Sequence, residues 1–514
     1  MPLLQAIRRN AMFRAREIAT IDGRRERTWS EFADTVARLA ACLSDMGARA
    51  GDRIGILALN SAAYLEAQFA IWWLGATVVP INIRWTVGEC CYAVGDSEIR
   101  FLFTDRDLYA QALALAQTAS PLVLIALDAD YPDNAPISAL PIAGATPRAA
   151  HSNRSDDLAG IFYTGGTTGV AKGVMLSHQA LWVNAMSIAL ASSFSARDRM
   201  LHAAPMFHLA DGGMSLATTI VGATHVFVRK FVAKDVVEAI ETARVTVTLL
   251  IPTMIQLLLD DPSYTPLKLA SLNKLSFGGA PISDALLTRL ARDLPAVALT
   301  HSYGQTEMGP TISFLEPRFQ YPGSPKKLSV GTAFAAVEVR LVDASGAEAA
   351  TGVPGEIWAR GPGQMSGYLN KPEETAQTIV KGGWIRTGDL ATRDEDGFLY
   401  ICDRIKDMVI TGGENVFSGE VENAILTHPA VVQAAVISVP DDAFGEQVHA
   451  VVVLKPGTVV TIEELRSHCQ RMIASYKCPR SLEIRSEMPM SAVGKVLKRE
   501  LRAPYWASRE RAVN

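Results

Sequence analysis

The stretch "YTGGTTGVAKGV", residues 163–174, combines four glycines, three threonines and one lysine. It follows the apolar run "LAGIF" at 158–162, which predicts a buried strand. Glycines let a backbone approach an anion closely, while exposed N–H groups, hydroxyls and an ammonium act as donors. The stretch therefore favours a polyphosphate-binding loop at the end of a strand, with a plain surface turn as the alternative.

Two common phosphate-binding motifs do not fit this loop. A Walker A motif has Gly immediately before its Lys and Ser or Thr immediately after it, whereas Ala171 and Gly173 flank Lys172. The spacing G-x-G-x-x-G does not occur in the stretch either. The loop therefore has the chemistry of a phosphate site without either motif.

Composition and charge narrow the class of protein. At 514 residues the chain exceeds one ordinary domain of about 100–200 residues, so two or more domains are expected. The net charge of −4 gives no basic excess of the kind that nucleic-acid binding requires, although a local basic patch stays open. Six scattered cysteines without a C-x-x-C pair indicate a reduced, cytoplasmic protein without a zinc or thioredoxin-type site.

The most apolar window, "AQFAIWWLGATVVPINI" at 67–83, is too short to span a membrane and is interrupted by Gly75 and Pro80. A buried helix followed by a strand is the interpretation that fits. Arginines break the N-terminal segment before an apolar run can form, so no signal peptide is expected.

Helical and strand patterns alternate along the first part of the chain. Apolar residues from Phe32 to Met46 share one helical face, with Ser30 as the expected N-cap. Strands are predicted at "RIGILAL" (53–59) and "ATVVPINI" (76–83), with a helix at about 62–74 between them. Further buried strands are predicted in "PLVLIAL", "THVFV", "VTVTLLIP", "KLSFGGAP" and "VALTHSYG". The fold class is therefore α/β, with mostly parallel sheets covered by helices.

The pattern changes after about residue 330. Strands "VEVRLVD", "GEIWARG" and "GFLYICD" are separated by turn signals, which predicts a more antiparallel, barrel-like subdomain. The segment from about 407 to 505 has strands and helices of its own and the length of a small α+β domain. The charged stretch "DRIKDM" at 403–408 lies at the junction.

A series of motifs then identifies a family. "YTGGTTGVAKGVMLSH" resembles the phosphate loop of the AMP-forming, adenylate-forming ligases, which include acyl-CoA synthetases, luciferases and peptide-synthetase adenylation domains. Other motifs of these ligases follow in order: "HAAPMFHLA" (202–210), "GGAP" (278–281), "YGQTE" (303–307), "GGWIRTGDL" (382–390), "GFLYICDRIKDMVITGGENV" (397–416) and "SAVGKVLKREL" (491–501). The resemblance implies an AMP- and acyl-binding domain at 1–403, a hinge at 404–406 and a mobile C-terminal domain at 407–514.

The chain departs from the family pattern at few positions. Gly165 stands where the loop usually has Ser, and Ala171 where Pro usually precedes the Lys. Ser418-Gly419 stands where Pro commonly appears, near the expected CoA entrance. None of these changes removes a charged catalytic group.

The resemblance implies a reaction in two halves. A carboxylate attacks the α-phosphate of ATP to give acyl-AMP and pyrophosphate, and the thiol of coenzyme A then displaces AMP. The implied cofactors are ATP, Mg²⁺ and coenzyme A. Because a carboxylate is a poor nucleophile toward an anionic phosphate, positioning and electrostatics are expected to dominate catalysis.

The same resemblance assigns roles to residues. The catalytic set is Lys495, which bridges the carboxylate and the α-phosphate, with Lys172 and His208; His208 positions the acyl group rather than acting as a base. Glu307 and Thr168 are the metal set, and Asp389, helped by Arg404, holds the ribose. The nucleotide-binding set is Thr164, Gly165, Gly166, Thr167, Thr168, Gly169, Lys172, Gly279, Ala280, His301, Ser302, Tyr303, Gly304, Thr306, Asp389, Ile401, Arg404 and Lys495.

The remaining assignments concern the acid and coenzyme A. The acyl pocket is assigned to Phe207, His208, Gly212, Gly213 and Gly309. CoA is assigned to Gly412, Gly413 and Asn415, and the hinge is centred on Lys406. A hairpin turn that needs the same two glycines is the alternative for 412–413.

The acid itself is not identified by these motifs. The segments after His208 and Glu307 are small and apolar, with Asp211 as the one charge, interpreted as a rim residue. The room left by small side chains favours a medium- or long-chain fatty acid, with a cinnamate- or benzoate-type acid close behind. A luciferase-like or carrier-protein-loading enzyme stays open. A non-catalytic nucleotide-binding protein is disfavoured because Lys495 and Glu307 are both present. The expected partners are the acid, ATP and CoA, with a homodimer as a possibility.

Overall fold

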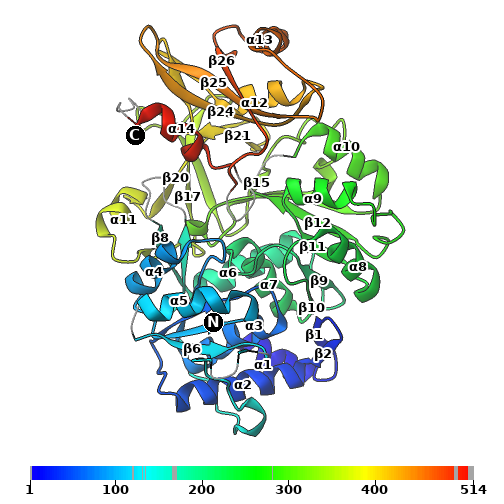
Figure 1. Ribbon diagram of the computed structural model, residues 1–514, viewed down its shortest axis with the longest axis vertical. Helices are drawn as coiled ribbons and strands as arrows, with labels where there is room; N and C mark the ends of the chain where they lie inside the picture. The colour runs from blue at the N-terminus through cyan, green and yellow to red at the C-terminus, as the bar shows by residue number, and fades with distance from the viewer. Residues whose placement is uncertain are drawn as a thin grey trace. The chain divides into compact units, whose positions relative to one another are not determined.

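The computed structural model describes residues 3–118, 121–129, 131–132, 135–164, 171–279, 282–490 and 496–507. The chain divides into two compact units. Unit 1 is Met1–Val339 with Ala359–Ile385, and unit 2 is Arg340–Trp358 with Arg386–Asn514. Both units combine helices with sheets, which confirms the predicted fold class (Figure 1). The boundary at 404–406 stays a prediction.

One sheet of unit 1 is built around parallel strands. Its strands are β1 (Ile18–Asp22), β2 (Arg25–Thr28), β9 (Arg199–His202), β10 (Thr224–Phe227), β11 (Val247–Leu249), β12 (Lys274–Gly278), β13 (Ala298–Tyr303), β14 (Ser313–Leu315) and β15 (Thr332–Ala333). They follow the order β15-β14-β13-β12-β11-β9-β10-β1-β2. The pairs from β13 through β1 are all parallel, as the sequence predicts.

The second sheet of unit 1 carries the glycine-rich stretch. Its strands are β3 (Arg53–Leu57), β4 (Thr77–Pro80), β5 (Phe101–Thr104), β6 (Val123–Ala126), β7 (Leu158–Thr164), β8 (Lys172–Ser177) and β18 (Gly367–Tyr368). The order is β18-β8-β7-β4-β3-β5-β6, parallel from β7 to β6. Strands β4 and β5 are buried at every residue, because a parallel sheet is covered on both faces.

Helices cover these sheets. They are α1 (Leu4–Phe13), α2 (Trp29–Asp45), α3 (Ala62–Leu74), α4 (Val87–Asp96), α5 (Tyr109–Thr118), α6 (His178–Ala191), α7 (Leu209–Val221), α8 (Ala233–Ala243), α9 (Pro252–Asp260), α10 (Asp284–Asp293) and α11 (Pro372–Thr378). In the described part of the chain, none of the helices is long and apolar enough to cross a membrane.

The start of α2 differs from the prediction. Its N-cap is Thr28 rather than Ser30. The Thr28 hydroxyl accepts from the N–H of Glu31, and the Glu31 carboxylate accepts from the N–H of Thr28 at 2.8 Å. Glu31 lies three residues after Thr28, and this spacing allows the reciprocal bonds of a capping box.

A third sheet follows, as predicted for the region after residue 330. Its strands are β16 (Glu338–Val342), β17 (Gly355–Arg360), β19 (Ile379–Val380), β20 (Trp384–Arg393) and β21 (Leu399–Arg404). Their order is β16-β17-β20-β19, with β21 also paired to β20. The pairs of β20 with β19 and β21 are antiparallel.

The C-terminal part of unit 2 is a small α+β structure, as predicted. Its elements are β22 (Val409–Thr411), β23 (Glu414–Val416), α12 (Ser418–Leu426), β24 (Val431–Asp441), β25 (Gly445–Leu454), α13 (Ile462–Gln470), β26 (Ser481–Arg485) and α14 (Lys498–Trp506). The sheet order is β23-β22-β25-β24, and β26 lies parallel to β25. Valines of β24 and β25 pack against α12 and α13 in a core of their own (orange in Figure 1).

Candidate active site

The glycine-rich stretch connects two antiparallel strands. At the ends of β7 and β8, Thr164 is the register partner of Lys172, and Tyr163 that of Gly173. A Cβ on Gly173 would lie 2.9 Å from Cγ2 of Ile161, so the strand pair requires glycine there. Of the predicted loop residues, Gly165, Gly166, Thr167, Thr168 and Gly169 lie outside the described residues.

Lys172 and Glu307 both contact Tyr368. The Nζ of Lys172 lies 5.0 Å from the ring centroid of Tyr368, and the Tyr368 hydroxyl donates to Oε1 of Glu307 at 2.8 Å. Burial, and then the charge of Glu307, raises the pKa of Tyr368, so the phenol stays protonated and donates. The fold thus brings together two predicted site residues from distant motifs through a residue that the sequence analysis missed.

Backbone pairing explains why Tyr368 lies there. Strand β18 pairs with β8, with Tyr368 opposite Val174. The N–H of Leu369 donates to the carbonyl of Gly173 at 2.8 Å, and that of Met365 to the carbonyl of Glu307 at 2.8 Å. The sequence offered only a weak indication that Tyr368 contacts site residues: it is the one tyrosine in the turn-rich stretch "GPGQMSGYLN".

The two motifs predicted to bind adenine meet at one edge of the parallel sheet. Gly278 is the register partner of Ser302, so β12 and β13 end side by side and place Gly279 next to Ser302 and Tyr303. Gly279 has a φ of +78°, which favours glycine. The carboxyl ends of parallel strands are a common ligand-binding edge, and the role in binding adenine stays a prediction. Ala280 lies outside the described residues.

His301 is held inside this sheet. Its ring stacks on Phe277 with centroids 4.8 Å apart, and its Nδ1 lies 3.2 Å from the Ser329 carbonyl oxygen. Burial lowers the pKa of His301 to about 4, so the ring is neutral at pH 7. A carbonyl only accepts, so Nδ1 carries the proton. His301 therefore packs the strand beside the predicted adenine site.

The turn that carries Thr306 and Glu307 is fixed from α6. A short 3-10 helix, Thr306–Met308, precedes Gly309. The Nδ2 of Asn184 donates to the Met308 carbonyl at 3.0 Å and to the Gly363 carbonyl at 3.1 Å. Asn184 is a second positioning residue that the sequence analysis missed. A Cβ on Gly304 would lie 2.1 Å from the Pro310 carbonyl oxygen, so this turn also requires glycine there.

His208 caps α7. Its Nδ1 accepts from the N–H of Ala210 at 3.2 Å, and the preceding Phe207 is buried. The cap fixes the ring of His208 at the start of α7, the helix that carries Gly212 and Gly213. His208, Gly212 and Gly213 are all predicted pocket residues.

Two of the three pocket glycines are enclosed by the chain itself. A Cβ on Gly213 would lie 2.9 Å from Cδ1 of Ile188, and one on Gly309 would lie 2.5 Å from the Gly363 carbonyl oxygen. Around Gly212 the first contact would be at 3.7 Å, an ordinary distance. The absence of side chains at Gly213 and Gly309 therefore allows the neighbouring groups to pack closely against the backbone there.

Asp211 does not lie at a rim, so that interpretation is wrong. It is fully buried, and its Oδ2 lies 2.7 Å from Nδ1 of His202. The other ring nitrogen of His202 lies 2.9 Å from Nδ1 of His225, whose pKa burial lowers well below its usual value. Asp211 therefore belongs to a buried polar network between α7 and β9–β10.

In unit 2 the predicted ribose pair is formed. Asp389 on β20 is the register partner of Arg404 on β21, and Nε of Arg404 lies 3.1 Å from Oδ1 of Asp389. Asp389 is buried, whereas Ile401 on β21 is 37% exposed. The exposed isoleucine is available for contact with a ligand.

The predicted CoA residues form a tight hairpin. Gly412 and Gly413 have φ values of +60° and +82° and connect β22 to β23, with Asn415 opposite Ile410. Two positive φ values are typical of a type I′ turn, so the turn alone accounts for both glycines.

Of the two predicted lysines Lys406 and Lys495, only Lys406 belongs to the described residues. Lys406 lies in a turn between β21 and β22, where the N–H of Asp407 donates to the Arg404 carbonyl at 2.9 Å. Lys495 lies outside the described residues. On either side of 491–495, Met490 and Val496 form an antiparallel bridge, and α14 begins two residues after Val496.

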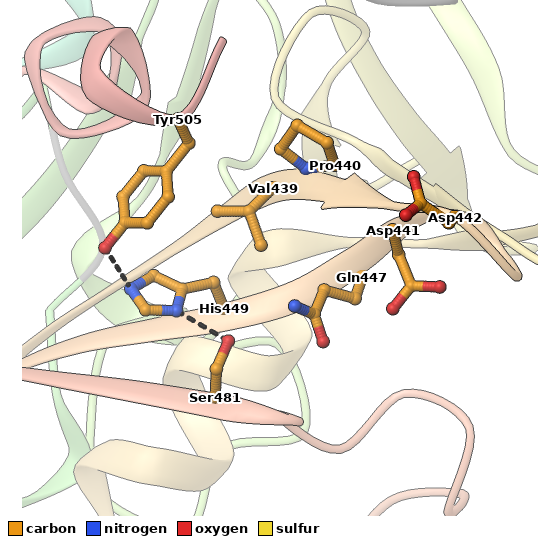
Figure 2. Close-up of a pocket in the computed structure, with 8 residues that line it drawn as sticks. All are labelled: Val439, Pro440, Asp441, Asp442, Gln447, His449, Ser481 and Tyr505. Atoms are coloured by element: carbon orange, nitrogen blue, oxygen red, sulfur yellow. Dashed lines mark hydrogen bonds between the residues drawn. The ribbon is translucent and has the colours of Figure 1, made fainter.

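A cavity of about 590 Å³ in unit 2 lies apart from the predicted site residues. Figure 2 shows His449 at its centre, with Nδ1 2.7 Å from Oγ of Ser481 and Nε2 3.2 Å from the hydroxyl of Tyr505. Its lining residues are Val439, Pro440, Asp441, Asp442, Gln447, His449, Ser481 and Tyr505. None of them belongs to a predicted site, so the cavity has no part in the assignments above.

A metal site made by protein groups alone was not found in the described ranges. Among these residues, no group of three or more His, Cys, Asp or Glu side chains could hold a metal ion. Glu307 offers one carboxylate, already oriented by Tyr368. This fits Mg²⁺, which commonly binds through one or two carboxylates plus substrate phosphates and water.

Comparison with known proteins agrees with the geometry. The family model described as "AMP-binding enzyme" matches residues 7–369, and "AMP-binding enzyme C-terminal domain" matches residues 420–495. A feruloyl-CoA synthase of Amycolatopsis sp. is 37% identical over 93% of this chain and 94% of its own length. The medium/long-chain-fatty-acid–CoA ligase FadD8 of Mycobacterium tuberculosis is 32% identical over 95% of this chain and 87% of its own.

A solved structure supports the same conclusion. The o-succinylbenzoate CoA synthetase of Bacillus subtilis, in complex with its acyl-adenylate intermediate, superposes with a TM-score of 0.86 at 28% identity, covering 100% of this chain and 99% of that one. The family models, the curated relatives and this solved structure agree with one another. The chain therefore belongs to the AMP-binding enzyme family and is an AMP-forming acyl-CoA ligase, an enzyme that uses ATP, coenzyme A and a carboxylic acid.

Proposed function

We propose that the acid is aromatic, either an arylpropenoate or a benzoate-type acid. The observation that carries this choice is the packing of the predicted pocket glycines. Ile188 and Pro310 occupy the space beside Gly213, and Asn184 and the Gly363 carbonyl occupy that beside Gly309. The free volume expected for a long acyl chain is therefore reduced at two positions, and a short, flat acid fits better.

The relatives are consistent with an aromatic acid. By name, one relative acts on ferulate, and the B. subtilis structure contains an o-succinylbenzoyl adenylate. A medium- or long-chain fatty acid is the second candidate, because FadD8 is also similar over most of its length.

For the first half-reaction we propose that one cluster handles the pyrophosphate end of ATP. Lys172 lies over the ring of Tyr368 and is available to neutralise phosphate charge, while Glu307 would hold Mg²⁺. A bound Mg²⁺ would neutralise charge on the leaving pyrophosphate. Lys495 bridges the acid and the α-phosphate, and Asp389 accepts from the ribose hydroxyls.

For the second half-reaction we propose that the C-terminal domain turns about Lys406 and presents Gly412, Gly413 and Asn415 to CoA. The hairpin has the exposed Phe444 beside it, with the N–H of Gly412 donating to the Phe444 carbonyl at 2.9 Å. The guanidinium of Arg480 lies 3.8 Å from the centroid of the Phe444 ring and adds a positive charge near that turn.

The acid is tested by pyrophosphate release across a matched panel. Ferulate, cinnamate and benzoate are compared with octanoate and palmitate, with and without CoA. We expect kcat/KM for the best aromatic acid to exceed that for either fatty acid by at least about tenfold. A poor fit of an acid in an apolar pocket weakens its transition-state binding by a few kcal/mol, which is enough for this ratio. A palmitate or octanoate rate above every aromatic rate would contradict the proposal and favour the second candidate.

A further inference from the structure

Ser418, the first residue of α12, joins two parts of unit 2. Its hydroxyl donates to Oδ1 of Asp403 at 2.9 Å, and its backbone N–H donates to Oδ2 of the same carboxylate. Ser418 is completely buried and Asp403 is 8% exposed. One residue thus supplies two donors to a buried carboxylate at the end of β21.

Lys498, the first residue of α14, completes this contact. Its Nζ donates to Oγ of Ser418 at 2.6 Å and pairs with Oε1 of Glu422 at 2.6 Å. Burial lowers the pKa of the Lys498 ammonium, but the carboxylates of Glu422, Asp407 and Asp403 outweigh it and raise the pKa above its usual value. The ammonium is therefore charged: it pairs with Glu422 and is also stabilised by the charges of Asp407 and Asp403.

Arg502, one turn further along α14, reaches the other end of the same segment. Its Nη1 donates to the Lys406 carbonyl at 2.9 Å and to Oδ1 of Asp407 at 2.8 Å. The far end of α14 is anchored separately, because the Tyr505 hydroxyl donates to Glu483 at 2.9 Å (Figure 2 shows Tyr505). The end of the helix is thus held against β26, while Arg502 holds residues 406–407 directly and Lys498 holds Ser418.

We propose that Ser418, Lys498 and Arg502 form a latch on residues 403–407 and act as positioning residues for the ligase reaction. The role rests on the proposed hinge at Lys406. Asp403 precedes that hinge, whereas Ser418 follows it, so the two bonds from Ser418 to Asp403 span it. A turn about Lys406 breaks them, and the latch is therefore made in one of the two catalytic arrangements. Because α14 begins three residues after Lys495, the latch sets how often Lys495 is presented.

Ser418 is an unusual residue for this position and offers a clean test. Proline, which commonly appears here in the resembling ligases, has neither the N–H nor the hydroxyl. It is also well tolerated at the first position of a helix, which Ser418 occupies. Ser418→Pro therefore removes both donors while keeping the start of α12.

The test measures the latch and its catalytic role separately. Hydrogen exchange of the peptide covering 403–408 reports the latch without any activity. The two half-reactions, acid-dependent pyrophosphate release and thioester formation from supplied acyl-AMP and CoA, report the role. The variants are Ser418→Pro, Ser418→Ala and Arg502→Ala, with the exposed Arg499→Ala on the same helix as control.

We expect exchange of 403–408 to rise at least about tenfold in Ser418→Pro, and less in Ser418→Ala, which keeps the N–H. The ratio of the two half-reaction rates shifts by at least about tenfold, because the latched arrangement serves one of them. Unchanged exchange overturns the latch. Faster exchange with an unchanged ratio, or with both rates reduced alike, overturns its positioning role. If the unmodified enzyme forms no acyl-AMP, the proposed function fails while exchange still decides the latch.

Discussion

At the scale of single residues, Tyr368 has the largest consequence for the proposed chemistry. Its hydroxyl fixes one oxygen of Glu307, and its ring lies under the ammonium of Lys172. A carboxylate that is oriented by a hydrogen bond binds a metal ion better than one that is free to rotate. Tyr368 therefore supports the proposed Mg²⁺ site without being a ligand itself.

Tyr368→Phe separates these two roles, because it keeps the ring and removes the hydroxyl. We expect pyrophosphate release at limiting Mg²⁺ to fall by about tenfold to a hundredfold, the usual effect of removing a group that orients a metal ligand. Excess Mg²⁺ should restore part of the rate. A titration of Mg²⁺ against the initial rate measures both effects.

The matched control is Tyr131→Phe, which removes a hydroxyl that donates to the Thr104 carbonyl at 2.8 Å, away from the predicted site residues. Its Mg²⁺ titration should match that of the unmodified enzyme. If Tyr368→Phe behaves like the control, Tyr368 does not support a metal site.

From the sequence, candidate residues could be selected only where a motif contains them. Lys172, Glu307, Asp389 and Arg404 were all selected in this way, and their roles stay predictions; the fold pairs Asp389 with Arg404. Tyr368 and Asn184 were missed because their importance comes from contacts with residues far away in the chain. Asp211 was misread because its partner, His202, lies on another element.

At the scale of elements, the start of α6 includes a buried histidine, His178, that makes the free energy of unfolding depend on pH. His178 is 1% exposed, its ring lies 6.1 Å from that of Trp72, and its Nδ1 has no hydrogen-bond partner among the described residues. Burial lowers the pKa of His178 to about 4. The unfolded chain therefore binds a proton that the folded chain excludes between about pH 6.5 and pH 4.

His178 thus lowers stability as the pH falls through this window, because the unfolded state binds more protons. We expect it to account for about 2 kcal/mol of the stability lost between about pH 7 and pH 5. His178→Phe should remove that part of the slope, since a phenyl ring has no proton to bind. Denaturant unfolding at the two pH values gives the difference directly.

The exposed His151→Asn serves as the control, and its slope should equal that of the unmodified enzyme. An unchanged slope in His178→Phe would mean that His178 is protonated in the folded state, in conflict with its burial.

Elements were predicted best where burial alone determines the pattern. The apolar runs at β3, β12 and β13 form strands of a largely parallel arrangement, and the helix expected at 62–74 is α3 (Ala62–Leu74). Boundaries depend on single side-chain bonds and were less accurate. The Thr28–Glu31 capping box, rather than Ser30, begins α2 because two reciprocal bonds outweigh one.

At the scale of the whole molecule, the account requires two half-reactions to share residues from both parts of the chain. The family models match the large part at 7–369 and the small part at 420–495 separately. Residues 403–407, which the proposed latch holds, lie in the chain between these two matches. The sequence predicted the order of these parts from the order of their motifs, but not the contacts that hold the hinge segment.

The measurement that tests the central claim most directly is the effect of Lys495→Ala on each half-reaction, with Arg499→Ala as the control. The account predicts that acid-dependent pyrophosphate release falls by about a hundredfold or more, the scale expected when a transition-state charge contact is lost. Thioester formation from supplied acyl-AMP and CoA should change by less than about fivefold, because Lys495 has left the site by then. Equal losses in both half-reactions, or an undiminished release of pyrophosphate, would contradict it.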